Sequence, residues 1–292
     1  MRYLLVSHNA GGAALLAAWA AHQGRDIEFD CLLSGPAVGV FCQRLGQANF
    51  IAQSAVALNR YTAVLTSTSS AETAWETRWV SQGRAAGIKT ISLLDHWTNY
   101  LSRFLWRGNY VFPDEIWVSD AYALALATEC RQQEPQYPKV RQIANFYLLD
   151  LVDYIHKRQA CNQHAGNILF VSEPSNNPLY TAQQVLEQFL AYLLAEPAAT
   201  KTLRLRLHPR EQLDDYADIR RQWEGRITFE LSSNTRLEDD LCWASWVVGC
   251  QTMAMVVALA AGIRVSSCLP ANVAKSALPH QEIPRLFPSL IN

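Results

Sequence analysis

The stretch Val247–Ala254, which reads VVGCQTMA, is an apolar strand pattern that breaks at Gly249 and continues as an apolar helical pattern to Gly262. Backbone N–H groups at the start of such a helix have no partner within the helix, and phosphate or carboxylate groups commonly bind there. The stretch therefore predicts a strand–turn–helix unit with an anion site at Gly249, Gln251 and Thr252. A plain connection between a strand and a helix has the same pattern, so both interpretations stay open.

The rest of the chain repeats this alternation of strand and helix patterns. Such alternation predicts the α/β fold class with parallel sheets, here two doubly wound Rossmann-like domains. A polar stretch over 151–166 is interpreted as a linker between an N-terminal domain, 1–150, and a C-terminal domain, 167–292. We expect an interdomain cleft that faces the carboxyl ends of both sheets. Strands are expected at 3–7, 27–33, 63–66, 90–94, 115–118, 140–144, 168–171, 203–207, 227–231, 246–248 and 264–267, and helices at 13–22, 38–45, 71–85, 121–131, 181–194, 213–223, 237–244 and 252–261.

The composition is that of a folded protein without a basic surface. Of 292 residues, 50% are hydrophobic and 17% charged, and Lys+Arg 25 against Asp+Glu 26 give a formal net charge of -1. A nucleic-acid partner is therefore not expected. The seven cysteines include no CxxC pair. We predict neither a disulfide framework nor a metal site, and we expect a reducing, cytoplasmic location.

Two apolar segments resemble membrane or export signals. Leu241–Ile263 carries no charge and is long enough to cross a bilayer. Polar residues and the turn at Gly249 interrupt it, so we predict strand, turn and helix there. The N-terminus is interpreted as a buried strand instead of a signal peptide, because His8 and Asn9 end its apolar run.

In the C-terminal half, His208 and Arg210 follow the strand expected at 203–207. Together they can hold a phosphate, the arginine through a bidentate contact and the histidine through a single donor. A solvated surface turn is the alternative. Ser172 and Glu173 follow strand 168–171 and are weaker candidates, because Ser-x-Pro often only ends a strand.

In the N-terminal half, His8, Asn9, Gly11 and Gly12 connect the first strand to the first helix. A glycine pair is typical of a loop that approaches a ligand, but the GxGxxG spacing of dinucleotide-binding proteins is missing. The sequence therefore predicts no dinucleotide cofactor.

Asp95 and His96 directly follow strand 90–94. Either side chain could act as a general base in a cleft. A carboxylate between the aromatic rings of Trp97 and Trp117 would lose solvation, which favours its protonated form. The alternative is that Asp95 caps a helix over 97–104.

Ser119 and Asp120 lie between strand 115–118 and helix 121–131. Such a pair is more typical of a helix cap than of a catalytic pair, and a place in the cleft stays open for it. Cys250 is interpreted as structural or as a contact to the ligand through its backbone, because the neighbouring sequence offers no base to activate a thiol.

In their order, these motifs resemble those of compact GT-B proteins, the fold of many nucleotide-sugar glycosyltransferases and of UDP-N-acetylglucosamine 2-epimerases. The His-Pro pair with a later threonine at a helix start is similar to bacterial sialyltransferases and related capsule-sugar transferases. In those enzymes the histidine contacts the phosphate of a CMP-sugar. The resemblance rests on His8–Gly12, Asp95–His96, Pro113–Asp120, Asn145–Tyr147, Ser172–Pro174, His208–Arg210 and Gly249–Thr252.

The resemblance implies a glycosyltransferase of hexosyl, sialyl or ulosonic type in polysaccharide biosynthesis. Its C-terminal domain would bind the nucleotide-sugar donor, and its N-terminal domain would bind a small-molecule or glycan acceptor. The E-x7-E pair of retaining transferases is not evident, because Glu173 and Glu238 are far apart and Glu230 precedes a different element. Cys250–Thr252 replaces the phosphate turn of the epimerases. A nucleotide-sugar hydrolase or epimerase and a non-catalytic binding protein stay open as alternatives, as do peripheral membrane association and an oligomeric state.

The resemblance also implies which residues form the site. They are Asp95 and His96 for catalysis, Ser172, Glu173, His208, Arg210, Gly249, Gln251 and Thr252 for the donor, and His8, Asn9, Gly11, Gly12, Ser119 and Asp120 for the acceptor side.

Overall fold

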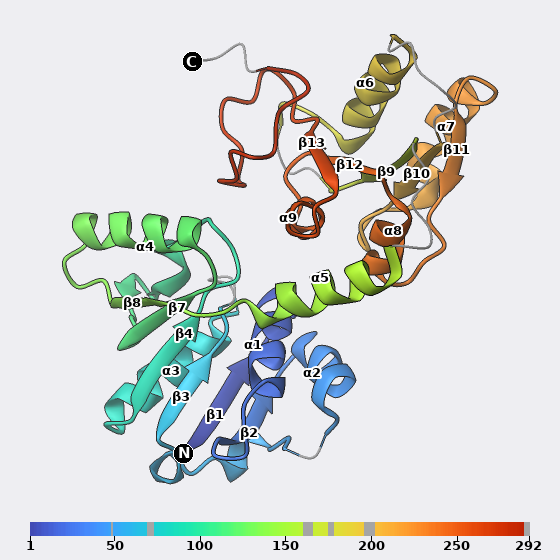
Figure 1. Ribbon diagram of the computed structural model, residues 1–292. Coiled ribbons are helices and arrows are strands. Elements are labelled where there is room, and N and C mark those ends of the chain that lie inside the picture. The colour runs from blue at the N-terminus through green and yellow to red at the C-terminus, as the bar shows by residue number, and fades with distance from the viewer. Residues whose placement is uncertain (48, 69–72, 160–165, 175–177, 196–201, 289–292) are drawn as a thin grey trace. The chain divides into compact units, whose positions relative to one another are not determined.

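The computed structural model divides the chain into two compact units, Met1–Tyr147 (unit 1) and Leu148–Asn292 (unit 2). It describes residues 1–47, 49–68, 73–159, 166–174, 178–195 and 202–288. Each unit is a parallel α/β sheet with its own helices (Figure 1).

Unit 1 contains a six-stranded sheet with the order β2-β1-β3-β4-β7-β8, in which every pairing is parallel. The chain builds β2 on one side of β1 and then returns to build β3 on the other side. A crevice for a ligand commonly forms at such a switch point, outside the carboxyl ends of the strands. The strands are β1 (Arg2–Ser7), β2 (Glu28–Leu33), β3 (Ala63–Thr66), β4 (Lys89–Leu93), β7 (Glu115–Val118) and β8 (Lys139–Gln142), and the helices are α1 (Ala10–Ala21), α2 (Ala37–Leu45), α3 (Trp75–Ala85) and α4 (Ala121–Gln133).

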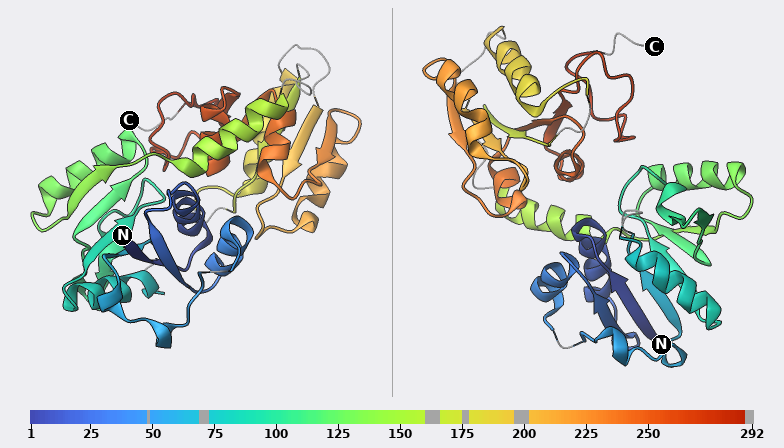
Figure 2. Two further views of the ribbon diagram at one scale, coloured as in Figure 1. Left: turned by 60° about the horizontal axis from the view of Figure 1, so that its bottom comes forward. Right: turned by 180° about the vertical axis from the view of Figure 1, so that it is seen from behind.

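Helices cover both faces of the unit 1 sheet (Figure 2). Successive side chains of a strand point to opposite faces, so a strand buried on both faces is apolar throughout. Leu5 packs with α1 and α2, while Leu4 and Val6 pack with Trp79 of α3. Between β4 and β7 the chain also forms the short antiparallel hairpin of β5 (Leu105–Trp106) and β6 (Asn109–Tyr110).

Unit 2 contains a five-stranded parallel sheet with the order β11-β10-β9-β12-β13. Its switch point lies between β9 and β12. One face buries Phe170, Phe189 and Trp246, with Tyr216 of a 3-10 turn (Leu213–Tyr216) against them. The strands are β9 (Asn167–Val171), β10 (Thr202–Arg206), β11 (Thr228–Leu231), β12 (Trp246–Gly249) and β13 (Arg264–Ser267), and the helices are α6 (Ala182–Ala195), α7 (Ala217–Trp223), α8 (Leu237–Trp243) and α9 (Met253–Ala260). The helix α5 (Phe146–Gln159) begins in the last two residues of unit 1 and continues in unit 2.

The stretch 151–166, interpreted as a linker, is helical as far as Gln159, because α5 continues to that residue. Leu151 and Ile155 lie four residues apart on one helical face and are buried, which stabilises the helix within a polar stretch. Residues 160–165 of the expected linker lie outside the described residues.

The helix considered over 97–104 is not formed. Asn99 has a φ of 62°, which interrupts a right-handed helix, and only Ser102–Phe104 makes a 3-10 turn. The uncharged stretch Leu241–Ile263 is divided among α8, β12 and α9, as the sequence predicts. Across the described part of the chain, no helix is long and apolar enough to span a membrane.

Candidate functional site

At the unit 2 switch point, β12 ends in close contact with β9. A Cβ atom on Gly249 would lie 2.8 Å from Cγ2 and 2.9 Å from the carbonyl oxygen of Val171. Only glycine fits this approach without a shift of the backbone. The turn after Gly249 therefore lies beside the end of β9, where the backbone N–H of Gln251 donates to Oε2 of Glu173 at 3.4 Å.

The side chains of Gln251 and Thr252 are used within the protein. Thr252 is the N-cap of α9, and its hydroxyl accepts from the N–H of Ala254 at 3.4 Å. Gln251 accepts from the N–H of Ala277 through Oε1 at 2.9 Å. The structure thus brings both residues to the site, with their side chains supporting the turn.

Glu173 is an unusual carboxyl group for a strand end. Burial is the main reason that the pKa of Glu173 rises to about 7, and the nearby Glu211 carboxylate adds to this rise. The hydrogen bond from the N–H of Gln251 opposes it. Close to neutral pH, a substantial fraction of Glu173 is therefore protonated and uncharged.

Glu211 joins the ends of β9 and β10. Its Oε1 accepts from the hydroxyls of Ser172 at 2.9 Å and Tyr216 at 2.6 Å, and its Oε2 accepts from the backbone N–H of His208 at 2.9 Å. Ser172 and His208, both predicted from the sequence, are thus brought together. Glu211 was missed, although its position three residues after His208 is the spacing of a side chain that turns back onto a backbone N–H.

His208 and Arg210 differ in exposure. His208 is half-buried, and burial followed by the charge of Arg210 lowers its pKa, while Glu211 acts in the opposite direction. Arg210 is exposed, and no described residue forms an ion pair or hydrogen bond with its guanidinium group. A half-buried imidazole and a free guanidinium group are thus available at the end of β10.

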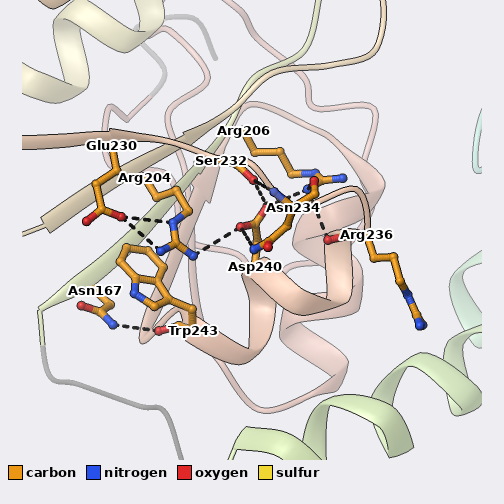
Figure 3. Close-up of polar contacts among 9 residues, drawn as sticks. All are labelled: Asn167, Arg204, Arg206, Glu230, Ser232, Asn234, Arg236, Asp240 and Trp243. Carbon is orange, nitrogen blue, oxygen red and sulfur yellow. Dashed lines mark hydrogen bonds and ion pairs between the residues drawn. The ribbon is translucent and has the colours of Figure 1, made fainter.

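The loop after β11 is held by Asp240, which is fully buried in α8. Its carboxylate accepts from Arg206 at 2.6 Å, from Asn234 at 2.7 Å and from Ser232 at 2.5 Å (Figure 3). Arg206 also donates to the carbonyl oxygens of residues 234, 235 and 236. Arg204 lies two residues before Arg206 on β10 and stacks on Trp243, with 3.8 Å between its guanidinium carbon and the ring centroid. The sequence reasoning missed this cluster.

In unit 1, Glu76 holds the loop after β1. Its Oε1 accepts from the backbone N–H of His8 at 2.8 Å and from the hydroxyl of Ser67 at 3.0 Å. A Cβ on Gly12 would lie 2.7 Å from Cβ of Ser67, so the start of α1 approaches the end of β3 closely. Asn9 is the N-cap of α1 and makes no side-chain capping bond.

Asp95 lies at the end of β4 in an ion pair. Its Oδ1 accepts from Nη1 of Arg103 at 2.7 Å and from the hydroxyl of Thr68 at 3.2 Å. Its Oδ2 would be 3.0 Å from a Cβ on Gly11. The charged partner of this carboxylate is thus the guanidinium group of Arg103, which the sequence reasoning did not include.

The two tryptophans bind other carboxylates. The indole N–H of Trp117 donates to Glu115, and that of Trp97 donates to Asp120 at 2.9 Å from Oδ2. Asp120 also accepts from the N–H of Ala123 at 2.7 Å and is the N-cap of α4, as the Ser-Asp pattern indicates.

His96 follows Asp95 and is turned back onto its own loop. Its Nδ1 accepts from the N–H of Trp97 at 3.0 Å and lies 3.3 Å from the hydroxyl of Thr98. Burial is the main cause that lowers the pKa of His96, Arg103 lowers it further, and Asp95 raises it. Among the described residues, no group of three or more His, Cys, Asp or Glu side chains is arranged to hold a metal ion.

The sequence matches no protein-family model, and a search of curated proteins finds no match. By structure, the chain is similar to the UDP-GlcNAc 2-epimerase from Methanocaldococcus jannaschii, with a TM-score of 0.64 and 8% identity over 91% of this chain and 83% of that chain. It is also similar to MnaA from S. aureus in complex with UDP (TM-score 0.57, 10% identity, 91% and 79% covered). A third similar structure is Acinetobacter baumannii MurG (TM-score 0.53, 10% identity, 91% and 78% covered). With its two Rossmann-like units, the chain has the GT-B fold.

Proposed function

We propose that this protein is a glycosyltransferase that binds a nucleotide-sugar at the carboxyl edge of the unit 2 sheet. The observation that carries the proposal is the convergence of Ser172 and His208 at the ends of β9 and β10 through Glu211, with Arg210 in the same turn as His208. This edge adjoins the switch point, where α/β proteins commonly bind nucleotides. The S. aureus protein of similar fold has UDP bound, which supports a nucleotide ligand here.

Charge favours unit 2 over unit 1 as the phosphate site. In unit 1, the carboxylates of Glu76 and Asp95 both face the start of α1, where they would repel a phosphate. In unit 2, the carboxylate of Glu211 already accepts three hydrogen bonds from the protein. Arg210 offers a free guanidinium group there, and the raised pKa of Glu173 reduces the negative charge near neutral pH. The donor phosphate is therefore assigned to unit 2 in this proposal.

Transfer of a sugar requires a proton acceptor for the attacking hydroxyl. Asp95 is the proposed base, because it is a partly exposed carboxylate at a strand end of unit 1. The acceptor oxygen would form a bond to the anomeric carbon as the bond to the nucleotide phosphate breaks. His208 and Arg210 would stabilise the charge that develops on the departing phosphate.

An epimerase is the second candidate, because the M. jannaschii protein of similar fold is a UDP-GlcNAc 2-epimerase. Both candidates require donor binding, so titration calorimetry with CMP-, UDP-, GDP- and TDP-sugars comes first. NMR of the products then separates them: an epimerase forms the C2 epimer without an acceptor, a hydrolase releases free sugar, and a transferase needs an acceptor. Failure of all four donors to bind would refute the proposal, and binding without turnover under every condition would indicate a binding protein.

A further inference from the structure

The turn at His208 is closed by three hydrogen bonds. The N–H of His208 donates to Oε2 of Glu211 at 2.9 Å, and the N–H of Glu211 donates back to the carbonyl of His208 at 2.9 Å. The N–H of Arg210 donates to Nδ1 of the His208 ring at 3.2 Å. The backbone and the ring of His208 are thus both fixed by its own turn.

The third bond determines where the ring proton lies. A backbone N–H can only donate, so Nδ1 of His208 must be the acceptor. A neutral imidazole has one donor and one acceptor nitrogen, which leaves the proton on Nε2. Protonating the ring would set an Nδ1–H against the N–H of Arg210, so the turn itself opposes the charged form.

His96 has the same arrangement in unit 1. Its Nδ1 accepts from the N–H of Trp97 at 3.0 Å, which also leaves its proton on Nε2. Both histidines follow strands of their parallel sheets at the carboxyl edge, His96 after β4 and His208 after β10.

We propose that His96 and His208 are held as neutral Nε2–H hydrogen-bond donors, that neither acts as a base, and that Glu211 is the positioning residue for His208. His208 would donate through Nε2 to a phosphate oxygen of the donor. This ligand rests on the proposed function, whereas the tautomers do not. Of the two residues implied for catalysis, Asp95 and His96, only Asp95 can then abstract a proton.

Taken together, burial and the surrounding charges favour the neutral form of both rings. For His208, burial and Arg210 lower the pKa, and Glu211 is the one charged group that raises it. For His96, burial and Arg103 lower the pKa, and Asp95 raises it. In both cases burial is the largest cause, so the net shift is downward.

NMR tests the tautomers directly, through long-range 1H–15N correlation spectra of protein labelled with 15N-histidine at pH 7. His96→Gln and His208→Gln assign the two rings among the seven histidines. His22 is an internal control, because its Nδ1 faces the carbonyl of Ala18 at 2.9 Å and must carry the proton. We expect the Nε2–H pattern for both rings and the Nδ1–H pattern for His22. A charged ring or an Nδ1–H pattern at His96 or His208 would overturn the inference, whether or not any nucleotide binds.

Titration with UDP and with CMP tests the ligand role. Glutamine can place an amide N–H near the position of Nε2, so His208→Gln should bind within about 3-fold of the wild type. His208→Ala should lose about 10-fold or more, the scale of a lost hydrogen bond to a charged group. Equal losses in both variants would contradict a donor role. If the wild type binds neither probe, the proposed function fails while the spectra still decide the tautomers.

Glu211→Gln tests the positioning role. It removes one of the two oxygens that close the turn, so the N–H of Arg210 should no longer be held against Nδ1 of His208. The His208 ring should then lose its single tautomer in the spectra, and nucleotide affinity should fall. Asp214→Asn is the matched control, because Asp214 is an exposed carboxylate in the following 3-10 turn. An unchanged His208 signal in Glu211→Gln would refute the role of Glu211.

Discussion

Arg206 donates from Nη1 to Oδ2 of Asp240 at 2.6 Å, and Asp240 has no exposed surface. Arg206 and Arg204 are two residues apart on β10 and point to the same face, where Asp240 of α8 meets both guanidinium groups (Figure 3). The two guanidinium groups offset the charge of this buried carboxylate, and its hydrogen bonds connect β10 and α8 with the loop at Ser232–Arg236.

Removing this carboxylate should destabilise unit 2. Asp240→Ala leaves two guanidinium groups without their shared partner, and breaking a buried ion pair costs about 3–5 kcal/mol. Urea unfolding measures this loss. Glu230→Ala is the control, since Glu230 pairs with Arg204 but is half exposed, and its loss should be below about 1 kcal/mol. Equal losses in both variants would show that Asp240 contributes no more than a surface pair.

Glu173 should make stability depend on pH. Its pKa rises from 4.5 to about 7 in the folded protein, so the folded state holds more protons than the unfolded state between these values. The contribution of Glu173 to stability therefore falls as the pH rises from about 4.5 to about 7, by up to about 3 kcal/mol, and then levels off. Urea unfolding of the wild type and of Glu173→Gln isolates this contribution, because the difference between their two curves should change across the window, while the difference between the wild type and the exposed control Glu224→Gln should not. A constant difference between the wild type and Glu173→Gln would contradict the raised pKa of this carboxyl group.

Cys250 should be dispensable for chemistry. Burial raises the pKa of its thiol, so the nucleophilic thiolate is scarce at neutral pH. Cys250→Ser should retain activity per folded molecule. A covalent adduct at Cys250, trapped during turnover and detected by mass spectrometry, would show the opposite.

The strands of the two parallel sheets were predicted within two residues, because apolar runs bounded by polar turns are local patterns. The short hairpin of β5 and β6 was not predicted. The errors came from features that local patterns do not contain. Asn99 adopts a left-handed conformation, and the apolar side of α5 becomes visible only through the burial of Leu151 and Ile155.

The site was predicted in part for the same reason. Residues directly after parallel strands share one edge of the sheet, so Asp95, Ser172 and His208 could be named from the sequence. Their partners could not, because Glu76 and His8 are 68 positions apart and meet only in the fold. Arg103, which pairs with Asp95, likewise lies in the short 3-10 turn Ser102–Phe104, and the sequence around this turn shows no helix or strand periodicity.

Arg210 should contribute to nucleotide affinity. Its guanidinium group is exposed and has no partner among the described residues, so a phosphate can bind it without breaking an internal contact. Arg210→Ala should weaken binding of UDP or CMP by about 10- to 100-fold, the effect of losing a charged hydrogen bond. Titration calorimetry measures this change, with Arg220→Ala on α7 as the control. Unchanged affinity in both Arg210→Ala and His208→Ala would exclude this edge as the phosphate site.

Asp95→Asn should separate catalysis from stability. The asparagine amide oxygen can still accept from Arg103 and Thr68, so the fold and the nucleotide affinity should be kept. The amide cannot take a proton, and kcat should therefore fall by about 100-fold or more, the scale of losing a general base. Asp114→Asn is the control for a structural carboxylate of unit 1, because Asp114 accepts from the backbone and hydroxyl of Thr90. The amide oxygen of this control can likewise still accept from Thr90, so its fold and its kcat per folded molecule should be unchanged. If Asp95→Asn behaves like the control, Asp95 serves only to hold Arg103, and the base must be sought elsewhere in the protein.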